Sequence, residues 1–204
     1  MKIAILGTGN VGATLGRKWA GKDHEVIFGV RDVSAGKHQA LLNTIKNGQA
    51  TIAPMVEAAE AAEVIVMALP GSVVPEIVVG LSPALSGKII VDATNHVSAS
   101  DMSSLKTLGV AVPNGKLFRA FNTLGWENFE TPELGGTQID LFYCGEPGAA
   151  QEIVEQLIAD VGLRPIYIGD LDKVSVLDAL TRLWFTLSSQ QGYGRRLAFK
   201  MLTA

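Results

Sequence analysis

The chain has 204 residues, of which 48% are hydrophobic and 18% are charged, and its formal net charge is −3. This length suits one domain, or one domain with a small appendage, and the apolar fraction is sufficient for a buried core. The slightly acidic balance argues against a nucleic-acid partner and against binding to an anionic membrane surface.

The chain has too few cysteines and histidines to form disulfide bonds or a zinc site. The single Cys144 and three scattered histidines provide neither a disulfide framework nor a zinc site. The N-terminus leads directly into a strand pattern without the features of a secretory signal, and no apolar run approaches the roughly 20 residues that cross a bilayer. We therefore expect a cytoplasmic protein with no metal and no membrane partner.

Short apolar runs alternate with helical patterns along the chain. Strands are predicted at residues 2–6, 25–30, 51–53, 64–68, 88–92, 118–121, 141–144 and 165–168. Helices are predicted at residues 10–20, 34–46 (with Ser34 as N-cap), 54–62, 72–79, 146–161 and 173–202 (with a break at Gly192 and Gly194). Residues 93–113 are polar and predicted to form loops. Apolar strands separated by helices indicate an α/β fold, a Rossmann-type doubly wound, mostly parallel sheet with a small C-terminal helical extension.

A glycine-rich segment joins the first strand to the first helix. Its sequence is Gly7-Thr8-Gly9-Asn10-Val11-Gly12, which matches the G-x-G-x-x-G pattern in the strand–turn–helix context that dinucleotide binding requires. In this pattern the first glycine permits the tight turn, the second lets the pyrophosphate approach the backbone, and the third lets the helix pack on the strand. The helix N-terminus then holds the phosphates. The alternative is a glycine turn without a ligand, in which the Thr8 and Asn10 side chains only shape the turn.

The end of the second strand distinguishes NADP from NAD. Counting about 20 residues from Gly12 reaches Asp32, which would favour NAD. The strand pattern instead places Val30 and Arg31 at the adenosine ribose, and Arg31 suits a 2′-phosphate because its guanidinium makes charge-assisted bonds. We therefore expect NADP, with Lys37 and His38 as possible additional contacts or as surface residues.

Further candidates follow the later strands, whose carboxyl ends meet at the ligand edge of a doubly wound sheet. Leu69 and Pro70 form an expected apolar ledge below a ribose. Asn95 and Asn122 follow the fifth and sixth strands, where their amides either bind a carboxamide or a second ring, or serve only as loop residues. Leu180, Leu183, Trp184 and Leu187 form an apolar stripe at helical spacing, which packs on its own domain or forms a homodimer.

Together these motifs resemble the NADPH-dependent reductases of the deazaflavin coenzyme F420, and the related soluble domain of the six-transmembrane ferric reductases. The matching segments are residues 5–12, 29–31, 91–95, 119–128 and 192–195, with Ala198 and Phe199. The most specific of these is Ala120-Phe121-Asn122-Thr123, with its Gly-Trp-Glu-Asn extension.

The resemblance implies an NADP-dependent oxidoreductase that transfers a hydride between NADP and a small-molecule acceptor, coenzyme F420 or a flavin. It places Thr8, Asn10, Val11, Val30 and Arg31 around the NADP phosphates. It places Ala120 at the cofactors and Asn122 against the second ring, as a catalytic residue. An NADP-binding domain over residues 1–170 and C-terminal helices over residues 171–204, which complete the acceptor site, are then expected.

The sequence departs from the family at two positions. Val30 stands where the family commonly has serine, which removes one hydroxyl donor to the 2′-phosphate. His96 stands where the family often has proline, either as an inert loop residue or as a proton donor to a carbonyl or imine substrate. The alternatives are therefore a carbonyl or imine reductase that uses His96, as in relatives of pyrroline carboxylate reductase, and a non-enzymatic NADP-binding redox sensor.

Overall fold

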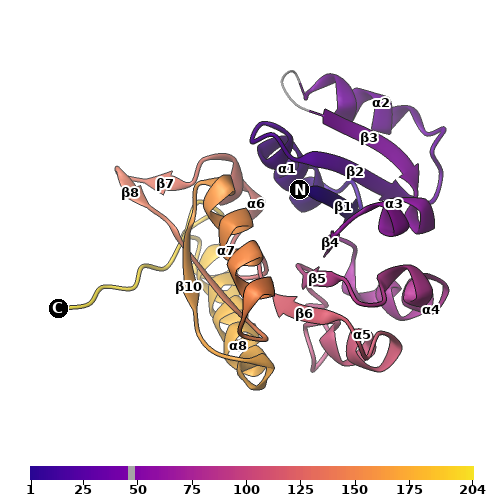
Figure 1. Cartoon of the computed structure of the whole chain (residues 1–204). Coiled ribbons are helices and arrows are strands. Elements are labelled where there is room, and N and C mark those ends of the chain that lie inside the picture. The colour runs from indigo at the N-terminus through magenta and orange to yellow at the C-terminus, as the bar shows by residue number, and fades with distance from the viewer. Residues whose placement is uncertain (46–48) are drawn as a thin grey trace.

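An eight-stranded sheet forms the centre of the molecule in a computed structural model that describes residues 1–45 and 49–204 (Figure 1). Its strands are β1 (Lys2–Leu6), β2 (Glu25–Val30), β3 (Gln49–Pro54), β4 (Val64–Met67), β5 (Ile89–Asp92), β6 (Lys116–Arg119), β9 (Asp140–Gly145) and β10 (Arg164–Tyr167). They lie in the order β10-β9-β6-β5-β4-β1-β2-β3. All neighbours are parallel except β6 and β9, so the predicted doubly wound, mostly parallel sheet is confirmed.

The central strands are apolar throughout because both faces of the sheet are covered. In β1, Ile3 and Ile5 belong to one buried cluster, whereas Ala4 and Leu6 belong to a second cluster on the other face. All four side chains have no exposed area. This alternation follows from the two-residue period of a strand and explains why these segments read as uninterrupted apolar runs.

Helices pack on the two faces of this sheet. The first cluster includes apolar residues of α1 (Asn10–Ala20) and α7 (Ala149–Val161), which contact each other. The second cluster includes residues of α3 (Met55–Ala61), α4 (Val74–Leu85) and α5 (Leu105–Ala111). The remaining α-helices are α2 (Gly36–Asn43), α6 (Trp126–Glu130) and α8 (Val174–Phe185). Among the described helices, none has both the length and the apolar character that crossing a membrane requires.

Several predicted boundaries change in the N-terminal half. The second helix begins at Gly36 without a side-chain cap, because Ser34 instead donates to the carboxylate of Asp32; residue 46 lies outside the described residues. The helix expected at residues 72–79 is α4, which follows a 3₁₀ turn and continues to Leu85. The region expected to be polar and rich in loops also contains α5, whose Leu105 and Leu108 are buried.

The prediction of helix up to residue 202 is wrong. Helix α8 ends at Phe185 and one π-helical turn, Thr186–Gln190, follows it; residues 191–204 form no helix or strand. Gly192 and Gly194 have φ values of +76° and +78°, a left-handed conformation that ends a helix. Beyond them Lys200 donates to Asp140, whose carboxylate also accepts the Met201 N–H. The C-terminal extension is therefore one helix followed by an extended tail (Figure 1).

Candidate functional site

The glycine turn after β1 is built by close backbone contacts. Gly7 has a φ of +114°, and a β-carbon there would stand 2.4 Å from the carbonyl oxygen of Ala68. A β-carbon on Gly12 would stand 2.2 Å from the carbonyl oxygen of Gly7. By contrast, a β-carbon on Gly9 would meet no atom within 4 Å. The outer glycines thus shape the turn, while Gly9 opens onto free space, as a phosphate cradle requires.

The N-terminus of α1 supplies backbone donors to this space. Gly9 is its N-cap, no side chain caps the helix, and no acidic residue lies in its first turn. The Ala13 N–H donates to the Gly9 carbonyl at 2.8 Å. The N–H groups of Asn10, Val11 and Gly12 precede this first helical bond and, with the helix dipole, favour an anion. The turn therefore fits the pyrophosphate of a dinucleotide.

A cleft of about 400 Å³ lies beside this turn. It collects residues predicted separately as cofactor contacts: Gly7, Thr8, Gly9, Val30, Arg31, Leu69 and Pro70. They come from the ends of β1, β2 and β4, which are adjacent in the sheet. The cleft therefore lies at the carboxyl edge, where doubly wound sheets bind their ligands.

The far end of the cleft carries opposite charges. Arg31 and Lys37 are exposed and line it together with Asp32 and the buried His38. Within the described residues, the Arg31 guanidinium has no hydrogen-bond partner. The Asp32 carboxylate accepts hydrogen bonds from the N–H and the hydroxyl of Ser34 at 2.9 and 2.6 Å, and the hydroxyl bond chiefly holds its pKa below the ordinary value. This carboxylate is thus ionised but turned toward its own loop, which leaves Arg31 available to a 2′-phosphate.

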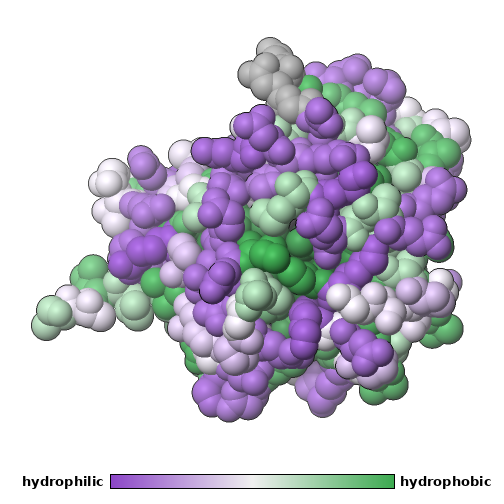
Figure 2. Space-filling model, in the orientation of Figure 1, coloured by the Kyte–Doolittle hydropathy of each residue, from purple (hydrophilic) through white to green (hydrophobic). Residues whose placement is uncertain are grey.

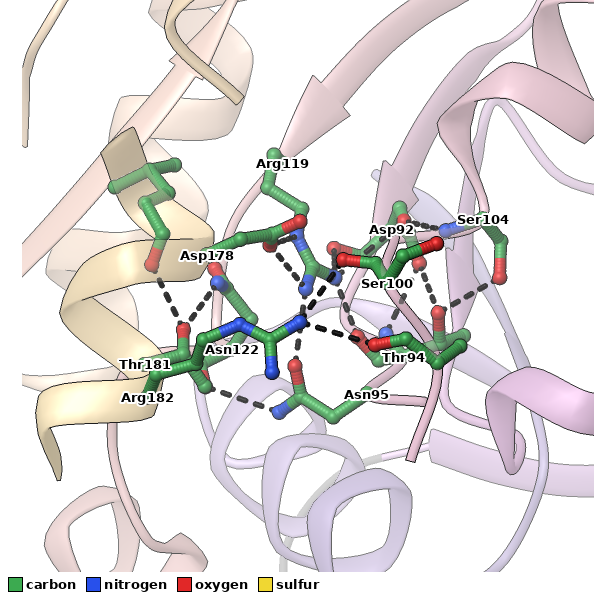
Figure 3. Close-up of polar contacts among 12 residues, drawn as sticks. Asp92, Thr94, Asn95, Ser100, Ser104, Arg119, Asn122, Asp178, Thr181 and Arg182 are labelled. Atoms are coloured by element: carbon green, nitrogen blue, oxygen red, sulfur yellow. Dashed lines mark hydrogen bonds and ion pairs between the residues drawn. The ribbon is translucent and has the colours of Figure 1, made fainter. Parts of the chain in front are cut away.

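A second group of polar residues follows β5 and β6 and centres on Arg119 (Figure 3). The Arg119 side chain is fully buried. Nε and Nη2 donate to Oδ1 of Asp178 on α8, at 3.2 and 2.9 Å. Nη2 also donates to Oδ1 of Asn95 at 2.9 Å, and Nη1 donates to the backbone carbonyls of Asp92 (3.3 Å) and Thr94. Arg119 thereby joins the ends of two strands to helix α8.

Sequence reasoning assigned no role to this arginine. The available signal was a charged residue directly after the apolar Leu117 and Phe118, beside a strand that ends in Asp92. Asp92 is itself buried, and its carboxylate accepts hydrogen bonds from the N–H and hydroxyl of Thr94 and from the N–H of Ser104. The pattern indicates a buried polar network but not its partner on α8.

The side chains of Asn95 and Asn122 form hydrogen bonds with other residues of the protein. Asn95 accepts from Arg119, and its Nδ2 donates to the backbone carbonyl of Asn122 at 3.0 Å. Nδ2 of Asn122 donates to the hydroxyl of Thr181 on α8 at 2.8 Å. Among the described residues, Oδ1 of Asn122 and Oγ1 of Thr123 are buried without a hydrogen-bond partner. These two oxygens are the polar groups that a ligand at this edge would satisfy.

The backbone just before Asn122 has an unusual conformation. Phe121 has a φ of +61°, which costs about 1–3 kcal/mol for a residue other than glycine. Its ring packs edge-on against Trp19 and Phe129, at centroid distances of 5.7 and 5.6 Å. The neighbouring Ala120, also predicted as a cofactor contact, is completely buried, and its N–H donates to the Asp92 carbonyl at 3.3 Å. Packing therefore imposes the backbone direction that orients Asn122.

His96 lies beside the loop that follows β4. A β-carbon on Gly71 would stand 2.8 Å from the β-carbon of His96, and the His96 N–H donates to the carbonyl of Met102 at 2.9 Å. The residue is partly buried. Its ring makes no hydrogen bond within the described part of the chain. The structure thus places His96 against Gly71, which directly follows Pro70 of the cleft lining.

Comparisons with known proteins agree with this geometry. The family described as NADP oxidoreductase, coenzyme F420-dependent, matches residues 2–96. The F420-dependent NADP reductase of Methanocaldococcus jannaschii is 26% identical over 97% of this chain and 98% of its own. The metalloreductase STEAP3 of Rattus norvegicus is 25% identical over 88% of this chain, but this chain spans only 36% of STEAP3.

Solved structures show the same architecture over the whole chain. A protein of Arthrobacter sp. FB24, assigned as an F420-dependent NADP reductase, is 25% identical with a TM-score of 0.87, and the match covers 100% of both chains. The imine reductase of Streptomyces aurantiacus, at 15% identity and a TM-score of 0.68 over 94% of this chain and 64% of its own, shares the fold alone.

The fold, the glycine turn and these matches define the class of the protein as an NADP-dependent oxidoreductase. Within that class the chain is similar to the coenzyme F420-dependent NADP reductases, so the resemblance indicated by the motifs is confirmed. The relatives that the chain resembles are named for NADP and coenzyme F420.

Proposed function

We propose that this chain transfers a hydride between NADP and a deazaflavin or flavin-like acceptor. The observation that carries the proposal is the cleft at the carboxyl edge of the sheet, which is lined both by the glycine turn and by Arg31. Within residues 1–45 and 49–204, the Arg31 guanidinium has no hydrogen-bond partner. The match of residues 2–96 to an F420-dependent NADP oxidoreductase family supports the same chemistry.

Each part of the cleft has a distinct binding task. The N–H groups of Asn10, Val11 and Gly12 would hold the pyrophosphate at the start of α1. Arg31 would bind the 2′-phosphate through charge-assisted hydrogen bonds, whereas the buried Val30 offers no side-chain donor. NADP selectivity in this proposal therefore depends mainly on one guanidinium.

The remaining residues would position the two rings. NADPH, when bound, supplies a hydride from its nicotinamide. The protein must hold the two rings at van der Waals distance and exclude water, with little acid–base help. Asn122 and Thr123 would offer their unpaired oxygens to the rings, and Leu69 and Pro70 would form the apolar ledge beneath the nicotinamide ribose. On the face shown in Figure 2, polar residues surround a hydrophobic area at the centre of the molecule.

A second candidate function uses His96. Its ring is unpaired within the described residues and it contacts the loop after β4, so it could donate a proton to a carbonyl or imine substrate. The imine reductase structures share only the fold and do not favour this chemistry over the first. A redox sensor that binds NADP without turnover is the third candidate.

We further propose a homodimer formed through the outer face of α8. Of the predicted stripe, Trp184 is buried and Leu183 is 46% exposed, and Val176, which lies outside the stripe on the same helix, is 55% exposed. Leu183 and Val176 line an apolar groove of about 480 Å³ together with Phe142 and Ile168, and a second copy would cover it. Sedimentation of a monomer at micromolar concentration would remove this proposal. The cytoplasmic setting and the division at residue 170 stay predictions.

The proposal is tested by NADPH and NADH oxidation with deazaflavin, FMN, quinone and ferric chelate acceptors. We expect turnover with NADPH and a deazaflavin or flavin, and weaker use of NADH. Tight NADPH binding without turnover on any acceptor would favour the sensor, and turnover only with carbonyls or imines would favour the His96 enzyme.

A further inference from the structure

The hydrogen-bonding capacity of Arg119 is fully used within the protein. A guanidinium has five N–H donors, and five hydrogen bonds join Arg119 to Asp178, Asn95 and two backbone carbonyls. A lysine at this position has only three donors on a single nitrogen. The fork of Arg119 is therefore required for simultaneous contact with the β5 end and with α8.

These bonds continue as a closed ring (Figure 3). Arg119 donates to Asn95, Asn95 donates to the backbone of Asn122, and Asn122 donates to Thr181. Thr181 and Asp178 are three residues apart on α8, so they face the same way, and Asp178 accepts from Arg119. Helix α8 is thus attached to the ends of β5 and β6 at two successive positions.

The residue after Thr181 on α8, Arg182, makes a further contact between this helix and the rest of the protein. Arg182 donates to the carbonyls of Ala99 and Ser100 at 3.0 and 2.9 Å. Both carbonyls belong to the loop that follows β5, as do Thr94 and Asn95. Helix α8 therefore binds the loop after β5 through Arg182, in addition to its contacts through Asp178 and Thr181 with Arg119 of β6 and with Asn122, which follows β6.

Stability alone does not explain why this ring of buried polar side chains is present. Buried ion pairs contribute little to stability compared with apolar packing of the same volume, but they can fix one arrangement. The ring also leaves Oδ1 of Asn122 and Oγ1 of Thr123 unpartnered among the described residues. A network that satisfies every donor of Arg119 but leaves these two oxygens open keeps them in a fixed position for a ligand.

We infer that Arg119 is a positioning residue for hydride transfer, and this inference rests on the proposed function. Arg119 fixes α8 and the Asn95–Asn122 pair relative to the cleft at Leu69 and Pro70, and so sets the approach of the two rings. It touches neither ring and takes no proton.

The test compares Arg119→Lys with Arg164→Lys. Arg164 also pairs with a buried carboxylate, that of Asp140, but it lies outside the ring. For each variant we would measure Tm, the NADPH dissociation constant, kcat, KM and the isotope effect with NADPH deuterated at its transferable position. We expect Arg119→Lys to bind NADPH within about threefold of wild type, to lose about 10- to 100-fold in kcat and to show a larger isotope effect. Arg164→Lys lowers Tm without changing kcat or the isotope effect.

An unchanged kcat and isotope effect in Arg119→Lys would overturn the inference, as would an equal loss in both variants. If Arg119→Lys does not fold, Thr181→Val takes its place, because it removes the hydroxyl that accepts from Asn122 at nearly constant volume. If wild type binds NADPH but has no turnover, the proposed function fails. The fluorescence of bound NADPH then judges the inference, which requires a nicotinamide environment that changes in Arg119→Lys and not in Arg164→Lys.

Discussion

The α-carbon of Gly12 faces the carbonyl oxygen of Gly7 so closely that a β-carbon on Gly12 would stand 2.2 Å from that oxygen. Gly9, between them, has open space at the same position and a φ of −70° that any residue adopts. The two glycines therefore predict opposite outcomes for the same substitution. Gly9→Ala should keep or slightly raise Tm, because alanine stiffens the unfolded chain, but it should weaken NADPH binding at least about tenfold by occupying the phosphate space.

Gly12→Ala is the matched variant. It should lower the free energy of unfolding by about 1–3 kcal/mol, as overpacking does, whether or not NADPH is present. Calorimetric titration with NADPH and thermal unfolding measure both effects. Unchanged NADPH affinity in Gly9→Ala would show that the phosphates do not lie at this turn.

Arg31→Ala tests the choice of dinucleotide. Charge-assisted hydrogen bonds contribute about 1.5–3 kcal/mol each, so losing one or more should raise the KM for NADPH about 10- to 100-fold. The KM for NADH should change little, since NADH has no 2′-phosphate. Steady-state kinetics with both cofactors measure the ratio. The control is Arg17→Ala, which removes an arginine of α1 that pairs with Glu130 of α6. Equal changes for NADPH and NADH would contradict the assignment.

The glycine turn and the central strands were predictable because local residues determine them. A buried parallel strand is an apolar run, and β1, α1 and β2 begin and end at the predicted residues. The glycine turn needs only its own backbone and the neighbouring strand. The bounds of these elements depend on neighbouring residues in the sequence, so local sequence patterns were sufficient to predict them.

Helix α8 could not be predicted in the same way. Its pattern predicts an apolar stripe that includes Leu180 and Leu183, covered by the protein's own domain or by a second copy, but Asp178 and Thr181 are buried and Leu183 is exposed. The reason is that two polar side chains find partners, Arg119 and Asn122, which lie 59 residues away in sequence. Hydrophobic periodicity assumes that polar residues face water, so it misplaces a helix that is held by a buried polar network.

His96→Ala distinguishes the two enzymatic proposals. If the acceptor is a deazaflavin or flavin, hydride transfer needs no proton from His96, and kcat should stay within about threefold. If the substrate is a carbonyl or an imine, loss of a general acid should lower kcat by about 100- to 10,000-fold. Turnover with each acceptor class gives the answer, and His96→Asn controls for the space that the ring fills.

The C-terminal tail predicts an acid-sensitive contribution to stability. Burial acts to raise the pKa of Asp140, but hydrogen bonds from Arg164, Lys200 and the Met201 N–H outweigh it and hold this pKa below the ordinary 3.8. A carboxyl with a lowered pKa stabilises the fold fully above its unfolded pKa, and this stabilisation is lost as the pH falls through the folded pKa. The tail contacts should therefore be complete at neutral pH.

Urea unfolding of wild type and Asp140→Asn measures this effect. The difference in the free energy of unfolding should be constant from about pH 7 to about pH 5 and should shrink below the ordinary carboxyl pKa. Asp101→Asn removes an exposed ion pair with Lys106 and should have little effect at any pH. A difference for Asp140→Asn that grows in acid would contradict the sign of the pKa shift.

The central claim, hydride transfer from NADPH to a deazaflavin or flavin-like ring, is tested most directly by isotope transfer. Purified wild type would be mixed with NADPH deuterated at its transferable position and with oxidised coenzyme F420, whose reduced carbon retains the transferred hydrogen. The account predicts deuterium on the reduced deazaflavin and none lost to solvent. Binding of both molecules without label transfer, or electrons that reach only ferric or carbonyl acceptors, would contradict it.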